Sequence, residues 1–238
     1  MFTVPKKIPE NLKFDIKSLE EEKANKYSHL VGVILWVLVA PFLLYFTLQL
    51  ESFEIKIGLL VYIISFLMLF GASTLYHSSY TLTQRNRFRV MDHVSIYCFI
   101  AGTYTPILLF YINTDFGKLV LFSLWVVTFI GTVFKLFFVG KFKLISTVIY
   151  LLMGWTAIFI VNIILETMPL NIFYWIAGGG VFYTIGTYFY MHKTLKYTHF
   201  YWHLFVLAGA ISHLVAIFLS VLGNITLKHI TNYKAMPP

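Results

Sequence analysis

The stretch YTHFYWHLFVLAGAISHLVAIFL, residues 197–219, is long and apolar enough to cross a lipid bilayer as one helix. A helix needs about 20 residues, each rising about 1.5 Å, to cross the hydrocarbon core. This stretch nevertheless contains His199, His203 and His213. A histidine inside the bilayer is costly and is retained where the imidazole has a role. The stretch therefore predicts a membrane-spanning helix and raises the question of what its three imidazoles do.

The composition extends this interpretation to the whole chain. Of the 238 residues, 59% are hydrophobic and only 12% are charged, which excludes an ordinary soluble domain. The apolar runs do not alternate as the strands of a membrane β-barrel would, so we read them as helices. The sequence predicts an all-α membrane protein, a seven-transmembrane helix bundle, with spans near 29–50, 57–77, 91–111, 119–139, 144–165, 171–191 and 199–222.

The segment before the first span mixes acidic and basic residues and has no apolar core, so it does not read as a cleavable signal peptide. We expect an N-terminal segment at 1–28, one transmembrane domain at 29–222 and a C-terminal tail at 223–238. The only cysteine, Cys98, lies in the third span. An internal disulfide is therefore impossible, and we interpret this thiol as a small apolar side chain.

The distribution of basic residues predicts the orientation of the bundle. With seven spans, fourteen of the 18 lysine and arginine residues fall on the side of the N-terminus. Because basic loops stay on the cytoplasmic side, we expect a cytoplasmic N-terminus and an outer C-terminus in a multi-pass protein of the cell membrane. This rule also accounts for the basic loop TQRNRFR (83–89) without a nucleic-acid partner.

Three histidines are predicted at one depth, at the cytoplasmic end of the bundle. His77 ends the second span, and His199 and His203 are four residues apart at the start of the seventh. Residues at i and i+4 share a helix face and can bind one metal ion, although this spacing alone often occurs by accident. Three imidazoles and one water form the open, catalytic type of zinc site. These histidines are therefore our candidate metal ligands, with zinc as the cofactor.

Two further residues are candidates for catalysis at this end. Asp92, at the start of the third span, can accept a proton from a water held by the metal or orient that water through the second coordination shell. Ser73 lies one turn before His77 and could donate a hydrogen bond to a developing oxyanion. The alternative for Ser73 is a hydrogen bond to its own helix or to a neighbouring helix.

The remaining polar residues have other predicted roles. His213 lies about 21 Å along the helix axis from His199, too far to share a metal, so we expect an interhelical hydrogen bond or a separate polar cavity. For His93 we favour helix packing over a role as a substitute ligand. Glu22 and His29, with Asn25 between them, form one helical stripe that would cap the first helix or close the site from the cytoplasm.

Three motifs carry a resemblance to a known family. They are E-x2-N-x3-H in EKANKYSH (22–29), S-x3-H in STLYH (73–77) followed by Asp92, and H-x3-H in HFYWH (199–203). Together they resemble the haemolysin III branch of the progestin and adipoQ receptor family, and MDHVSIYCFIAGTYTP (91–106) is similar to the third span of that branch. The resemblance covers all seven spans in order.

The resemblance implies seven helices with the N-terminus inside and a zinc ion on the residues matching His77, His199 and His203. It also implies that Asp92 reaches the metal through water. The wider group is similar to alkaline ceramidases, which implies hydrolysis of a lipid amide. The short N-terminal tail and the absence of proline in the last motif depart from the hormone receptors. We therefore expect a bacterial member without hormone recognition.

Two functions remain open from the sequence, and a third has less support. The first is a zinc-dependent hydrolase of a lipid amide or ester, with a membrane lipid as substrate. The second is a non-enzymatic sensor or effector, acting in membrane homeostasis or cytolysis, in which zinc is structural. A channel or transporter is disfavoured because no pair of half-helices suggests an inverted repeat. The sequence leaves the substrate and any homo-oligomer undecided.

Overall fold

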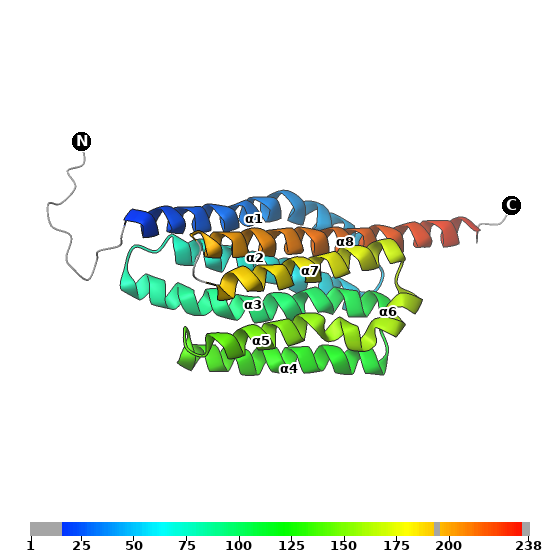
Figure 1. Cartoon of the computed structure of the whole chain (residues 1–238). Coiled ribbons are helices and arrows are strands. Elements are labelled where there is room, and N and C mark those ends of the chain that lie inside the picture. Colours follow the sequence, from blue (N-terminus) through cyan, green and yellow to red (C-terminus); the bar gives the residue numbers. More distant parts are fainter. Residues whose placement is uncertain (1–15, 193–195, 235–238) are drawn as a thin grey trace.

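The apolar runs form long helices that lie side by side and alternate in direction (Figure 1). The computed structural model describes the backbone of residues 16–192 and 196–234 and the side chains of 19–192 and 196–228. In chain order the helices are α1 (Ile16–Gln49), α2 (Phe53–His77), α3 (Leu82–Tyr111), α4 (Asp115–Phe138), α5 (Lys143–Gly154), the short 3-10 helix η2 (Trp155–Ile160), α6 (Val161–Thr167), α7 (Leu170–Met191) and α8 (Thr198–Lys234).

Six helical segments in the described part of the chain are long and apolar enough to cross a membrane: α1 from Leu19, α2, α3, α4, the continuous α5–η2–α6 segment, and α8 to Lys228. The remaining long helix, α7, has 22 residues but is rich in glycine and tyrosine, which lowers its hydropathy. The chain is therefore an all-helical membrane protein.

Three helices extend by at least nine residues beyond the spans that hydropathy predicts. α1 begins at Ile16 instead of 29, α3 begins at Leu82 instead of 91, and α8 continues to Lys234 instead of ending at 222. The added turns of α1 and α3 are rich in lysine, glutamate, arginine and glutamine, which favour helix but lower hydropathy. Charged residues counted as loop or tail therefore belong to helices that carry the site.

The helices are joined by short connections with polar caps. The side chains of Ser52, Thr81 and Thr114 each accept a hydrogen bond from a backbone N–H in the first turn of α2, α3 and α4 respectively. Such caps satisfy amide groups that have no partner within the helix. They fix where each helix begins and hence the depth of its side chains.

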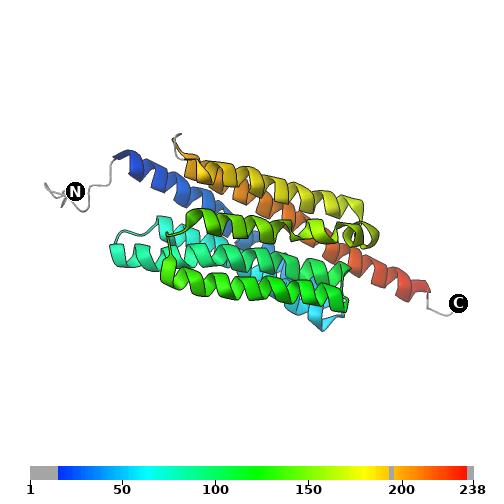
Figure 2. The same ribbon diagram turned by 60° about the horizontal axis from the view of Figure 1, so that its bottom comes forward.

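The packing brings distant parts of the sequence together. The most extensive contacts join α2 to α3 and α7 to α8, and α1 packs against both α2 and α8. α4 and α5 lie at the edge of the bundle, beside α3 (Figures 1 and 2). Because α1 begins at the end of the bundle where α2 ends and α8 begins, the first, second and seventh predicted spans meet at that end.

A tyrosine from α3 interrupts the α5–η2–α6 segment. The Tyr104 hydroxyl donates to the Gly154 carbonyl (2.6 Å) and accepts from the Ala157 amide (3.0 Å). Both groups would otherwise belong to the helical hydrogen-bond ladder, and a side chain inserted there is a known cause of local distortion. The segment changes to a 3-10 helix at Trp155, in the wall of an internal cavity described below.

Candidate metal centre

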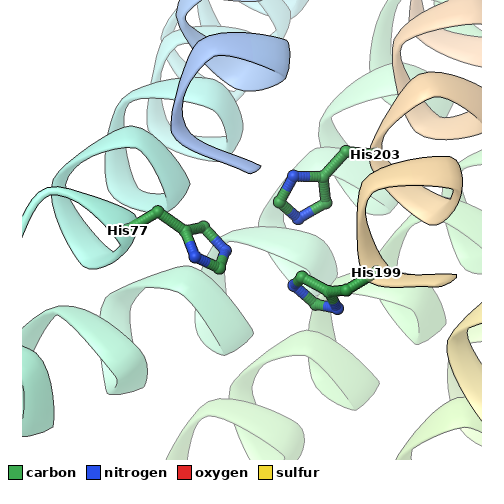
Figure 3. Close-up of side chains that lie close together, drawn as sticks. All are labelled: His77, His199 and His203. Atoms are coloured by element: carbon green, nitrogen blue, oxygen red, sulfur yellow. The ribbon is translucent and has the colours of Figure 1, made fainter. Parts of the chain in front are cut away.

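His77 is the last residue of α2, and His199 and His203 lie in the first two turns of α8. Their rings face one another across a small gap (Figure 3), and one ring nitrogen from each lies within 4.8 Å of the others. In a tetrahedral zinc site with zinc–nitrogen bonds of about 2.0–2.1 Å, the ligand nitrogens are about 3.3 Å apart. The three imidazoles therefore approach ligand spacing and need only small side-chain rotations to reach it.

His77 is oriented by a carboxylate from α1. Its Nδ1 atom lies 2.7 Å from Glu22 Oε2, and Arg85 donates to the other oxygen of Glu22 at 2.6 Å. Because an ionised carboxylate can only accept, the hydrogen of this imidazole is on Nδ1. Nε2 is then left with its lone pair, and this atom is buried without a hydrogen-bond partner. A carboxylate–histidine pair of this kind typically fixes a metal ligand.

His203 is oriented by the same helix. Its Nδ1 lies 3.2 Å from the backbone oxygen of Asn25 and 3.0 Å from the Ser28 hydroxyl, which itself donates to that oxygen. The carbonyl oxygen can only accept, so His203 also carries its hydrogen on Nδ1. Helix α1 therefore prepares Nε2 of both His77 and His203 as unprotonated metal ligands.

The buried polar atoms support a metal centre at this position. Nine buried side-chain nitrogen and oxygen atoms in the described part of the chain make no hydrogen bond, and five of them are here: Asn25 Oδ1, both ring nitrogens of His29, Ser73 Oγ and His77 Nε2. Buried polar groups are normally satisfied by protein, water or an ion. Three imidazole donors suit zinc and several other transition metals, so the donor set fits a metal ion without fixing its identity.

The two candidate catalytic residues lie beside the histidines. The Asp92 side chain is only 14% exposed. It lines the same internal cavity as His199 and His203 but does not belong to the three-histidine cluster. Ser73 is completely buried, and its hydroxyl lies beside the Asp92 carboxylate without making a hydrogen bond of normal geometry. Asp92 therefore lies at the polar end of the cavity but outside the three-histidine cluster.

The cavity leads away from this polar end into the bundle. Its volume is about 220 Å³. The wall is mostly apolar and comes from α3, the α5–η2–α6 segment, α7 and α8, with members such as Ile100, Ile107, Ile164, Phe173 and Val206. A long apolar cavity that ends at a cluster of histidines and a carboxylate has the shape and chemistry to hold an amphipathic molecule.

Three further histidines lie in or near the site. His29 does not cap α1: it lies within that helix and is buried, with its ring centroid 3.7 Å from that of His203. His93 lines the cavity, with Nδ1 3.9 Å from Asp92 Oδ2. His213 is separate from the cluster and makes the interhelical contact expected of it, with Nε2 3.1 Å from the Ile176 backbone oxygen of α7, and it also lines the cavity.

Sequence reasoning missed two supporting residues. Arg85 was counted only as a basic residue of the cytoplasmic side, yet it holds Glu22 against His77. Ser28 lies within the EKANKYSH motif without being a motif position, and its hydroxyl contacts His203. Neither partner is separated by a regular spacing from the residue it supports, so only the packing of α1 against α2 and α8 reveals them.

The helices and the site together define a multi-pass integral membrane protein with a candidate intramembrane metal centre. A model of the family described as Haemolysin-III related matches residues 17–214. The chain therefore belongs to the haemolysin III family, the branch of the progestin and adipoQ receptor family that its motifs resemble, and is a multi-pass protein of the cell membrane.

Known relatives cover most of the chain. It is 36% identical over 193 residues to a hemolysin-3 homolog of Bacillus subtilis (strain 168), covering 81% of this chain and 91% of that protein. It is 34% identical over 192 residues to hemolysin-3 of Bacillus cereus, with coverages of 81% and 88%. The human monocyte to macrophage differentiation factor is 29% identical over 203 residues, which are 83% of each chain.

Proposed function

We propose that the protein is a zinc-dependent intramembrane hydrolase that cleaves a lipid amide, as a ceramidase does, or a lipid ester. The observation that carries the proposal is the meeting of two features: a cluster of three imidazoles, two of them oriented by α1, with Asp92 beside it, and an apolar cavity that starts there. The cavity would hold the acyl chain, and the polar end would hold the bond to be cleaved. A substrate would enter sideways between helices, since its chains are as apolar as the bilayer.

The residues at the polar end have distinct roles in this proposal. Zinc bound by His77, His199 and His203 would polarise a carbonyl and lower the pKa of a bound water. Asp92 would accept the proton of the attacking water and return it to the leaving group. The Ser73 hydroxyl, which has no partner of normal geometry, would donate to the carbonyl oxygen as negative charge develops there.

The proposal places the site at the cytoplasmic face of a seven-span protein with an inner N-terminus and an outer C-terminus. Support comes from the fourteen basic residues assigned to that side and from α1 beginning and α8 ending at opposite ends of the bundle (Figure 1). Reporter fusions check the topology: a fluorescent protein should be active at the N-terminus and alkaline phosphatase at the C-terminus. Alkaline phosphatase activity at the N-terminus would contradict it.

Lipid hydrolysis by purified protein tests the activity. Wild type, Asp92→Asn and Ser73→Ala are incubated with ceramides and phospholipids, and released fatty acid and bound zinc are measured together. Asp92→Asn should abolish release and keep its zinc, because Asp92 lies outside the three-histidine cluster. Ser73→Ala should reduce release by roughly 10²–10³-fold, the usual effect of losing one oxyanion donor. Fatty-acid release that is unchanged in Asp92→Asn would refute the catalytic claim.

A second candidate function is a sensor or effector in which zinc only fastens helices. It is favoured by the contacts at the site itself, since Glu22 and Asn25 of α1 hold histidines of α2 and α8. Two relatives are named hemolysins, which gives cytolysis as one form of this function. Under this alternative no lipid of the panel is hydrolysed, although chelation still lowers thermal stability.

A further inference from the structure

Two polar groups in the cavity wall, far from the histidine cluster, have no partner. The Tyr183 hydroxyl and His213 Nδ1 are both buried without a hydrogen bond, and both residues line the cavity. Five other hydroxyl groups around the cavity each donate to a backbone carbonyl, namely those of Thr103, Tyr104, Tyr150, Thr184 and Thr187. Unlike these groups, and away from the histidine cluster where His29 also lacks partners, the pair is unsatisfied, which calls for a physical reason.

The chemistry of the pair is complementary. His213 Nε2 lies 3.1 Å from the backbone oxygen of Ile176, which can only accept, so the imidazole hydrogen is on Nε2. Nδ1 therefore presents a lone pair that needs a donor. The Tyr183 hydroxyl can donate and accept, and its ring centroid lies 5.3 Å from that of His213. Together the two residues offer one acceptor and one donor.

Glycines make room for both side chains. A Cβ atom on Gly179 would lie 2.3 Å from His213 Cδ2, and one on Gly209 would lie 2.7 Å from the Tyr183 ring. The AGGG run at 177–180, which the sequence alone indicated as close helix packing, therefore accommodates a particular polar ring. The pair sits in a site built by the close approach of α7 and α8.

We propose that Tyr183 and His213 form a polar subsite that binds a hydroxyl group on the apolar chain of a lipid lying in the cavity. This inference rests on the proposed occupancy of the cavity by a lipid. A hydroxyl accepts from Tyr183 and donates to His213 Nδ1, whereas a ketone satisfies only Tyr183 and an unsubstituted chain satisfies neither. A chain that lacks the hydroxyl leaves both buried polar atoms unpaired and therefore binds more weakly.

The position of the subsite limits where the hydroxyl lies. His213 is ten residues beyond His203 on the same helix, about 15 Å along the axis. A lipid with its polar end at the histidine cluster would therefore carry the hydroxyl far along its chain and not beside the head group. The ligand class is a chain-hydroxylated fatty acid or a lipid containing one.

Binding of free fatty acids to the full-length protein tests the subsite without requiring turnover. A fluorescent fatty acid in detergent is displaced by equal-length chains that are unsubstituted, or that carry a keto or hydroxyl group at successive positions. We expect tightest binding for the hydroxyl at one distal position, about fivefold over the unsubstituted chain, which corresponds to about 1 kcal/mol. The keto chain should be intermediate.

Tyr183→Phe is the decisive variant, because it removes only an oxygen that makes no hydrogen bond. It should bring the preference well below fivefold, because only His213 Nδ1 is left to pair with the hydroxyl, and it should bind the keto and unsubstituted chains equally. Tyr111→Phe is the matched control: its hydroxyl donates to Ser220 and it does not line the cavity, so it should keep the preference.

Three results would overturn the inference. Equal binding of hydroxylated and unsubstituted chains to wild type, or a preference that stays fivefold in Tyr183→Phe, would overturn the subsite alone. Absence of binding by every fatty acid would overturn the subsite together with the proposed lipid cavity. If wild type hydrolyses no lipid but still prefers hydroxylated chains, only the proposed hydrolase activity is rejected.

Discussion

Glu22 should control metal affinity although it is not a ligand. Its carboxylate lies 2.7 Å from His77 Nδ1, the His77 side chain is only 2% exposed, and Arg85 holds the other oxygen. Partners of this kind typically change metal affinity by 10–100-fold. Gln keeps one acceptor oxygen but loses the charge, so Glu22→Gln should weaken zinc binding about tenfold, or about 1.4 kcal/mol. Glu22→Ala removes the acceptor and should approach a hundredfold.

Competition with a chromophoric chelator in detergent measures these dissociation constants. Glu20→Gln is the matched control, since Glu20 is exposed two residues earlier on α1, and it should bind zinc as wild type does. The reasoning fails if Glu22→Gln and Glu22→Ala both bind zinc with wild-type affinity, or if Glu20→Gln weakens binding equally.

Three further predictions concern stability, measured by thermal unfolding in detergent. Gly179→Ala should lower the free energy of unfolding by roughly 1–3 kcal/mol through overpacking, because the added Cβ would meet the His213 ring. Gly223→Ala is the control: its surroundings are open, so it should be neutral or stabilising. Equal effects of the two substitutions would contradict the packing. Tyr104→Phe should lower the free energy of unfolding by about 1–3 kcal/mol, because two backbone groups of the interrupted helix lose their hydrogen-bond partner. An unchanged Tm would count against that contact. Zinc at about a hundredfold excess over its Kd should stabilise wild type by about 2.7 kcal/mol but not His199→Ala; equal stabilisation would exclude His199 as a ligand.

Much of the fold could be predicted from the sequence because bilayer thickness fixes the length of each apolar run. The helix ends could not, since hydropathy ends where charged residues begin, while the backbone of α1 continues helical from Ile16. Lys135, a charged residue within the span predicted at 119–139, likewise lies in α4 and is only 2% exposed. Hydropathy detects the membrane, but hydrogen bonding and packing determine where a helix stops.

The candidate site, like the fold, could be predicted from the sequence only in part. His77, His199 and His203 could be grouped from spacing and span direction, because those set depth in the bilayer. The contacts of Arg85 with Glu22 and of His29 with His203 could not, since they depend on how α1 rotates against α2 and α8. Predicting side-chain contacts between helices requires the angle and rotation at which the helices pack, and no simple periodicity in the sequence gives these.

Metal analysis of purified protein tests the central claim most directly. Wild type should contain about one zinc per chain, and His77→Ala and His203→Ala should contain little, since each removes one of three ligands. His213→Ala is the matched control, a half-buried histidine on the same helix as His203 that lies outside the cluster, and it should retain the zinc of wild type. Equal zinc in wild type, His77→Ala and His203→Ala would contradict the metal centre.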